Sequence, residues 1–279
     1  MNVGIVGLGL IGGSLAKAIK ENTPHKVFAG DISQSAFLEA KLFGAVDGNL
    51  DSKSVSECDF IIVSVYPSAA ADYIKGNAAR FKKGAVVVDC CGVKRGICAQ
   101  IAPVAAKNGF VFIGGHPMAG TQSWGFRHSR PTLFNKASML LSPPDGIDIG
   151  ALDAAKKFFM GLGFGEVVFT TPEEHDRIIA FTSQLAHVVS SAYIKSPAAA
   201  EHKGFSAGSY KDMTRVAKLN EDMWSELFVE NRDFLAGEID GLIAGLAEYR
   251  DAVKSGDAEK LRELLKEGRE RKESIERGR

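Results

Sequence analysis

Short apolar runs separated by amphipathic stretches fill the first 170 residues of the chain. Five of these runs, rich in Val, Ile and Phe, are predicted to be buried strands at 2–7, 26–30, 60–65, 85–90 and 110–114. Two further strands are expected at 137–142 and 165–171. Strands that alternate with helices form βαβ units, in which a parallel sheet is covered by helices on both faces.

The pattern changes after Thr171, where no further strand is evident. A helix is predicted from Pro172, since proline at the first helical position and acidic residues in the first turn are typical of helix N-termini. Residues 220–253 predict one amphipathic helix of ~30 residues, or ~45 Å at 1.5 Å per residue. Its length favours a second subunit as the partner of its apolar face. Residues 258–277 predict a charged helix.

These patterns define the expected fold class and its boundaries. We predict an α/β Rossmann-type parallel-sheet domain at 1–170. An all-helical C-terminal domain at 171–279 follows, whose long helix is expected to form a homodimer.

Composition mainly excludes other classes of protein. The 279 residues include 34 Lys and Arg and 34 Asp and Glu, so the formal net charge is zero and no basic surface for nucleic acid is indicated. No apolar run reaches the ~18 residues of a membrane span, and no basic leader with a cleavage site begins the chain. The four cysteines lack the spacing of zinc ligands. We expect a cytoplasmic protein with no metal, membrane or nucleic-acid partner.

The run GLGLIGGS lies between the first strand and the first helix. Its Gly-x-Gly-x-x-Gly pattern permits a tight turn, a close backbone approach to a pyrophosphate, and close packing of helix on strand. Asp31 ends the next strand, where a carboxylate accepts hydrogen bonds from ribose hydroxyls and repels a 2′-phosphate, so NAD is favoured over NADP as the cofactor. An alternative is that Asp31 only caps the next helix. The residues expected at the cofactor are Gly7, Leu8, Gly9, Leu10, Ile11, Gly12, Asp31 and Ser64.

His116 lies in the run GGHPMAG, directly after the strand FVFI. Pro117 restricts the backbone of His116 to extended conformations, and ligands of parallel sheets bind beyond the carboxyl ends of the strands. An imidazole has an ordinary pKa near 6.5, so at this place it is a candidate general base. A structural histidine bonded to a loop carbonyl is the alternative.

Several runs together resemble the prephenate/arogenate dehydrogenase family across nearly the whole chain. They are GLGLIGGS, GGHPMAGT, TPEEHD, TSQLAH and YKDMTRVAKLNEDMWSELFVEN, in this order. The resemblance implies oxidation of the C4 hydroxyl of prephenate with hydride transfer to NAD and loss of CO₂. The product is 4-hydroxyphenylpyruvate, a precursor of tyrosine.

The resemblance also implies roles for individual residues. His116 becomes the catalytic base, Arg215 the guanidinium that grips a substrate carboxylate, and His187 a second histidine of the pocket. Lys211 supports Arg215, and Thr121 and Gln122 lie at the substrate. His175 and Asp176 match the family's His-Asp pair, for which capping and interdomain hydrogen bonding are as plausible as substrate contact.

The chain departs from the family pattern at three positions. Gly92 stands where many relatives have a serine that supports the catalytic histidine, so a partner for His116 must come from elsewhere, with Thr121, Ser123 and water as the alternatives. Gln122 replaces a glutamate, and Gln184 replaces a histidine.

Three other readings stay open. Arogenate dehydrogenase differs only in the side chain of its substrate. A 3-hydroxyacid dehydrogenase would need a lysine on the first long helix, which offers His187 and no lysine before Lys195. A non-catalytic nucleotide sensor would need Gly7 and Asp31 but neither His116 nor Arg215.

Overall fold

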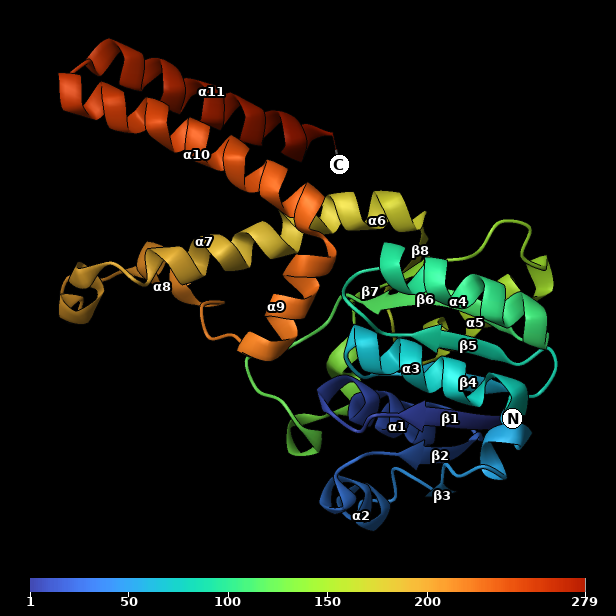
Figure 1. Ribbon diagram of the computed structural model, residues 1–279. Helices are drawn as coiled ribbons and strands as arrows, with labels where there is room; N and C mark the ends of the chain where they lie inside the picture. Colours follow the sequence, from blue (N-terminus) through green and yellow to red (C-terminus); the bar gives the residue numbers. More distant parts are fainter. Residues whose placement is uncertain (279) are drawn as a thin grey trace. The chain divides into compact units, whose positions relative to one another are not determined.

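The computed structural model describes residues 1–278, which fall into two compact units, Met1–Asn231 and Arg232–Arg279. The first unit holds one eight-stranded sheet and a group of helices that follows it in the sequence (Figure 1). The expected fold class, an α/β Rossmann-type domain followed by a helical region, is confirmed. The predicted boundary at residue 170 lies within the first unit and stays a prediction.

The strand order of the sheet is β3-β2-β1-β4-β5-β6-β7-β8. All seven strands expected from apolar runs are present. The additional strand, β3, has only two residues, Gly48 and Asn49, and so carries no apolar pattern. The strands are β1 (Asn2–Val6), β2 (Lys26–Gly30), β3 (Gly48–Asn49), β4 (Phe60–Val63), β5 (Val86–Asp89), β6 (Val111–Pro117), β7 (Ser138–Ser142) and β8 (Glu166–Phe169).

The sheet departs from the expected parallel arrangement at β6 and β7, which pair antiparallel. Gly114 to Pro117 align with Ser142 to Met139, so β6 continues for three residues beyond the predicted end at 114. His116 therefore lies within a strand, opposite Leu140, and not in a loop after it. The ladder to β7 holds the backbone of His116 on one side, which apolar periodicity alone does not reveal.

Helices cover both faces of the sheet. Apolar residues of α1 (Leu10–Asn22) and α5 (Ile149–Gly161) form one buried core with β1 and β2, against which α2 (Gln34–Leu42) also packs. On the other face, α3 (Pro67–Asn77) and α4 (Arg95–Asn108) lie side by side over β4 and β5 (Figure 1). Short 3₁₀ turns complete the connections, at Ser54–Glu57, Ala78–Arg80, Phe126–His128, Pro131–Phe134 and Pro197–Glu201.

The helix predicted from Pro172 is present with a change of pitch in its middle. The segment α6 (Pro172–Ile179) leads through one π-helical stretch, Ala180–Leu185, into α7 (Ala186–Tyr193). Thr171 caps its start by accepting the amide of Glu174. Shorter helices follow, α8 (Gly208–Thr214) and α9 (Glu221–Glu230).

The prediction of one helix over 220–253 is wrong, because the chain breaks at Asn231 between α9 and α10 (Arg232–Ser255). Asn231 is fully buried, and its side-chain amide donates to the backbone oxygen of Asp176 at 2.9 Å and to Oε1 of Gln184 at 2.7 Å. These bonds offset the lost helical ladder. The seven-residue gap in apolar spacing between Leu227 and Phe234 spans this break.

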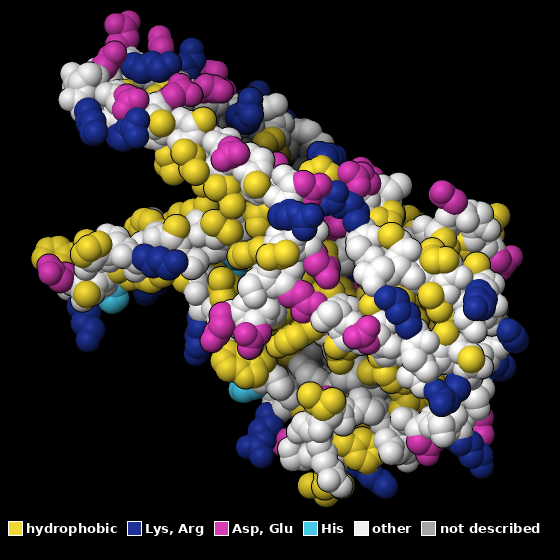
Figure 2. All heavy atoms as spheres, viewed as in Figure 1, with side chains coloured by type: hydrophobic (Ala, Val, Ile, Leu, Met, Phe, Trp, Pro, Cys, Tyr) yellow, Lys and Arg dark blue, Asp and Glu magenta, His cyan; other side chains and the backbone are white. Residues whose placement is uncertain are grey.

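The second unit consists of α10 and α11 (Ala258–Arg277), which contact each other. The charged tail helix is confirmed, with ion pairs of (i, i+4) spacing along it. Hydrophobic side chains lie exposed on α10, including Ile243, Leu246 and Val253 (Figure 2). Among residues 1–278, no helix has the length and apolar character needed to cross a membrane.

Candidate active site

The glycine-rich turn has the geometry that a dinucleotide phosphate requires. Gly7 has a φ of +87°, and a Cβ on Gly12 would lie 1.9 Å from the carbonyl oxygen of Gly7. Gly9 is the N-cap of α1, and no side-chain hydrogen bond caps the helix there. A Cβ placed on Gly9 would meet no atom within 4 Å. The start of α1, from Leu10 and Ile11 on, therefore presents free N–H groups and a positive dipole end to open space, which fits a pyrophosphate.

Asp31 follows the last residue of β2 and faces this turn. Its Oδ2 accepts the amide of Leu8 at 2.6 Å and its Oδ1 accepts the amide of Ser33 at 2.7 Å. The N-cap of α2 is Ser33, whose hydroxyl accepts the amide of Ala36, so Asp31 is not the cap of that helix. Ser64 follows β4 and donates its amide to Val6, and its carbonyl lies directly beside Gly7. The glycine-rich turn, the Asp31 carboxylate and Ser64 therefore lie together at the carboxyl ends of β1, β2 and β4.

His116 is joined to a second histidine from the helical region. Its Nδ1 lies 3.0 Å from Nε2 of His175, the fourth residue of α6. His175 is buried, and its Nδ1 lies 2.7 Å from Oδ1 of Asp176. Burial, the neighbouring His175 and the charge of Lys94 together lower the pKa of His116 well below its ordinary value. This environment favours the neutral ring of His116, in which one nitrogen keeps a lone pair.

Asp176 is anchored at the N-terminus of α4. Its two oxygens accept the backbone amides of Lys94 and Arg95 at 2.7 and 2.9 Å, and Nε of Arg95 lies 3.3 Å from Oδ2. Burial acts to raise the pKa of Asp176, but the hydrogen bonds from His175, Arg95 and Lys94 outweigh it and lower that pKa. Asp176 is thus an anion held by a helix N-terminus, as the dipole favours.

A buried ion pair that the sequence analysis missed lies beneath the two histidines. Nζ of Lys94 bonds Oδ2 of Asp89, and both side chains are fully buried. Oδ1 of Asp89 accepts the amide of Gly115, next to His116, and Oδ2 accepts the amide of Cys91. The pair therefore fixes the ends of β5 and β6. The one available signal was a carboxylate and a lysine flanking the short run CCGV, which is equally typical of an exposed turn.

Gly92 and Leu227 line the other side of the catalytic candidate. A Cβ on Gly92 would lie 3.4 Å from both methyl groups of Leu227 and 4.0 Å from Cε1 of His116. Leu227, on α9, is buried. The nearest neighbour of Gly92 on this side of His116 is therefore an apolar side chain. The observed hydrogen-bond partner of the ring is His175, and neither Thr121 nor Ser123 bonds to it among the described contacts.

A second cluster contains Trp224, which lies on α9 one helical turn before Leu227. The predicted residues His187, Arg215 and Gln122 belong to this cluster. The ring of Trp224 contacts the ring of His187, with ring centroids 3.9 Å apart and the ring planes tilted by 30°. Burial lowers the pKa of His187, while its bond to the carbonyl of Ser183 acts to raise it and the charge of Arg215 lowers it further. Gln122, from the loop after β6, donates to the backbone oxygen of Arg215. Trp224 was not singled out in the sequence, although it lies in one of the family-like runs.

The remaining substrate candidates, Thr121 and Lys211, are exposed. The hydroxyl of Thr121 donates to the carbonyl of Ser123 within its own loop. Lys211 lies within α8, one helical turn before Arg215, which is the C-cap of that helix. Neither makes a side-chain contact with His116 or His187 among the described residues, so their assignment remains a prediction.

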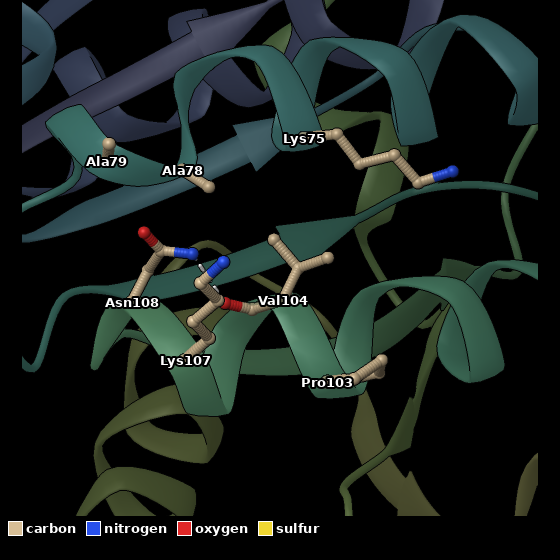
Figure 3. Close-up of a pocket in the computed structure, with 7 residues that line it drawn as sticks. All are labelled: Lys75, Ala78, Ala79, Pro103, Val104, Lys107 and Asn108. Atoms are coloured by element: carbon tan, nitrogen blue, oxygen red, sulfur yellow. Dashed lines mark hydrogen bonds between the residues drawn. The ribbon is translucent and has the colours of Figure 1, made fainter.

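A hollow of about 420 Å³ lies elsewhere, between the end of α3 and the second half of α4 (Figure 3). It is lined by Lys75, Ala78, Ala79, Pro103, Val104, Lys107 and Asn108. In a βαβ unit the C-terminal ends of the helices lie at the sheet edge opposite the carboxyl ends of the strands. The hollow is therefore not the site of His116. Among residues 1–278, no group of three or more His, Cys, Asp and Glu side chains is placed to hold a metal ion.

Comparison with known protein families assigns both regions of the chain to one family. Residues 15–168 match the family model "Prephenate dehydrogenase, nucleotide-binding domain", and residues 171–267 match "Prephenate dehydrogenase, dimerization domain". Both the sheet region and the helical region are thus covered by one family.

Individual relatives extend this similarity over the whole chain. A prephenate dehydrogenase of Bacillus subtilis (strain 168) is 28% identical over 279 residues, which is 97% of this chain and 75% of the relative. A cyclohexadienyl dehydrogenase of Zymomonas mobilis is 29% identical over 275 residues, or 95% of this chain and 93% of the relative. The crystal structure of prephenate dehydrogenase from A. aeolicus, in complex with hydroxyphenyl propionate and NAD⁺, superposes with a TM-score of 0.87 at 28% identity. That superposition covers 99% of this chain and 98% of the other.

Proposed function

Because this chain belongs to the prephenate dehydrogenase family, we propose that it oxidises and decarboxylates prephenate to 4-hydroxyphenylpyruvate with NAD, in tyrosine biosynthesis. The observation that carries the proposal is the imidazole of His116, whose Nδ1 faces His175 at the carboxyl edge of the sheet that also holds the glycine-rich turn. That edge is where parallel sheets bind their ligands.

NAD, when bound, accepts the hydride from C4 of the substrate ring. Gly7, Gly9 and Gly12 leave room for its pyrophosphate at the start of α1. The carboxylate of Asp31 has lone pairs left for the ribose hydroxyls and would repel a 2′-phosphate, which supports NAD over NADP.

His116 acts on the C4 hydroxyl. The O–H bond breaks as its proton moves to the imidazole, the hydride leaves C4, and a ring ketone forms. The bond to the ring carboxylate then breaks, CO₂ leaves, and its electron pair makes the ring aromatic. The phenolate oxygen takes the proton back from His116, so atoms and charge balance over the reaction. A positioned base of this kind typically contributes a factor of about 10²–10⁴ in rate.

Arg215 and His187 are proposed to hold the substrate carboxylates. A guanidinium binds a carboxylate through two parallel hydrogen bonds, which fixes orientation as well as charge. The side-chain amide of Gln122 positions Arg215 by donating to the backbone oxygen of Arg215, and Trp224 positions the ring of His187 by direct contact. Lys211 and Thr121 are proposed as further contacts of this pocket.

We also propose a cytoplasmic homodimer, with the sheet domain ending at residue 170 and the helical domain beginning at 171. The match of residues 171–267 to a dimerization domain supports the dimer, as do the exposed apolar residues of α10. The family-model boundaries at 168 and 171 support the division.

The deciding experiment measures NADH formation at 340 nm with prephenate and with arogenate, each against NAD and NADP. We expect turnover with prephenate and NAD. His116→Asn should lower kcat by about 10²–10⁴ without changing the affinity for NAD. Arg215→Lys should chiefly raise the KM for prephenate, because a lysine cannot form the bidentate pair. Absence of turnover with every pair of substrate and cofactor would overturn the proposal.

Arogenate is the second candidate substrate. The Zymomonas mobilis relative carries the name cyclohexadienyl dehydrogenase. A ratio of kcat/KM above one for arogenate over prephenate would assign the chain to that activity instead.

A further inference from the structure

The contacts of His175 bear on which nitrogen of His116 carries its proton. We propose that His175 is a positioning residue that holds His116 as the tautomer protonated on Nδ1, so that Nε2 presents a lone pair to the substrate hydroxyl. The role of Nε2 toward the substrate hydroxyl rests on the proposed function, whereas the tautomer of His116 does not.

Asp176 sets the direction of these hydrogen bonds, because an ionised carboxylate can only accept them. Four donors converge on its two oxygens: the amides of Lys94 and Arg95, Nε of Arg95, and Nδ1 of His175. This arrangement favours the charged form of Asp176. The nitrogen of His175 that faces it, 2.7 Å away, must therefore carry a proton.

The state of the second nitrogen of His175 follows from its surroundings. Desolvation and the charge of Lys94 act against a positive charge on the buried ring of His175, and they outweigh the influence of Asp176 and Asp89, which favours it. A neutral ring with its proton on Nδ1 has a lone pair on Nε2. That lone pair lies 3.0 Å from Nδ1 of His116.

His116 must then donate from Nδ1, since otherwise two lone pairs would face each other in a buried contact. A neutral imidazole that donates from Nδ1 has its free lone pair on Nε2. The reverse polarity would need a second proton on His175, and thus a cation beside the buried Lys94 ammonium. The chain Asp176–His175–His116 therefore has one favoured direction of donation, away from the substrate side.

The tautomer is fixed only if the rings cannot turn, and the surrounding groups prevent this. The amides at the N-terminus of α4 hold Asp176. Asn231 donates to the carbonyl of Asp176 and to the buried Gln184, which ties α6 to the end of α9. Leu227 packs against Gly92 beside Cε1 of His116. These contacts make the orientation of both imidazoles a property of the fold.

Two substitutions of His175 separate this role from a merely structural one. His175→Gln places an amide oxygen near the position of Nε2, so that the acceptor for His116 is kept and the donor to Asp176 is lost. His175→Asn places an amide nitrogen near the position of Nδ1, so that the donor to Asp176 is kept and the acceptor is lost. The two variants form a matched pair, and NAD affinity checks that each is folded.

The expected order of activity is wild type, then His175→Gln, then His175→Asn. We expect kcat with prephenate to fall by less than about tenfold in the glutamine variant and by about 10²-fold or more in the asparagine variant, within the range of a lost general base. The KM for prephenate should change by less than about threefold in both. An equal or reversed order of the two variants would overturn the proposal, because it would show that only the bond to Asp176 matters.

A spectroscopic measurement tests the tautomer without any turnover. Long-range ¹⁵N–¹H correlation spectra of histidine-labelled wild type, with the ring of His116 assigned through His116→Asn, should show a protonated Nδ1 and an unprotonated Nε2 at pH 7.5. A protonated Nε2 would overturn the proposal. Inactivity of the wild type with both substrates would instead refute the proposed function and leave this measurement valid.

Discussion

The anchoring of Asp176 on α4 gives a quantitative prediction for Asp176→Asn. The carboxylate has exposure of 1% and receives four hydrogen bonds. Asparagine keeps one oxygen and replaces the other with an NH₂ group, so two of the donors face a donor instead. Each carboxylate oxygen accepts one backbone amide, from Lys94 or from Arg95, so one of the two lost donors is a backbone amide in either orientation of the asparagine. Water does not easily reach this amide, because α4 begins next to the fully buried Lys94.

The magnitude follows from the number of lost bonds. A hydrogen bond to a charged group contributes about 1.5–3 kcal/mol, so two lost bonds correspond to about 3–6 kcal/mol. Arg95 has side-chain exposure of 25%, which lets water compensate part of its loss. The expected decrease in the free energy of unfolding is therefore about 3–5 kcal/mol, as for other broken buried pairs. At about 2–4 °C per kcal/mol for a protein of this size, Tm should fall by roughly 10 °C.

The assay is thermal unfolding followed by circular dichroism at one fixed protein concentration. Glu173→Gln is the matched control, because the carboxylate of Glu173 lies 3.7 Å from the same Arg95 but is 67% exposed. An exposed pair contributes about 0–1 kcal/mol, so this variant should melt within about 3 °C of the wild type. A Tm for Asp176→Asn equal to that of Glu173→Gln would refute the reasoning that a buried anion holds α4.

Three further predictions address the cofactor, the pH dependence and the dimer. Gly12→Ala would place its Cβ 1.9 Å from a backbone oxygen, so titration calorimetry should show NAD binding weakened at least about tenfold, roughly 1.4 kcal/mol; Gly76→Ala, at an open helical position, should bind NAD as the wild type does. The lowered pKa of His116 means that its neutral form persists as pH falls through about 6.5; log kcat/KM should therefore be level from pH 7 to 8 and decline only below the ordinary histidine pKa, and a midpoint above it would contradict the assignment. Ile243→Glu with Leu246→Glu places charges on the exposed apolar side chains of α10, so sedimentation should show a monomer, whereas an unchanged dimer would mean that the interface lies elsewhere.

Local pattern was sufficient for most of the elements. Seven strands follow from apolar runs, and the reason is plainest for β4 and β5, since buried parallel strands are continuously apolar. The turn at Gly7 to Gly12 follows from glycine spacing, because only glycine permits a φ of +87° beside Ser64 and the contact of Gly12 with Gly7. His116 was identifiable as a candidate because a proline and glycines surround it at the end of an apolar run.

The sequence could not reveal which groups meet. His116 and His175 are 59 residues apart, and Asp176 lies 82 residues from the amide of Lys94 that it accepts. Neither distance leaves a periodic signal. The same limit explains the missed break at Asn231, where a polar residue within a helical pattern is compatible with an exposed helix until its buried partners are known.

By itself, then, the amino-acid sequence determined the elements, the phosphate-binding turn and the presence of a candidate base, because these depend on the conformational preferences of neighbouring residues. The tertiary structure alone decided the environment of that base. Only folding brings the anion of Asp176, the ring of His175, the Lys94–Asp89 ion pair and the side chain of Leu227 around His116. Burial and hydrogen bonding, which set the charge and the tautomer of an imidazole, arise from contacts between segments that are distant along the chain.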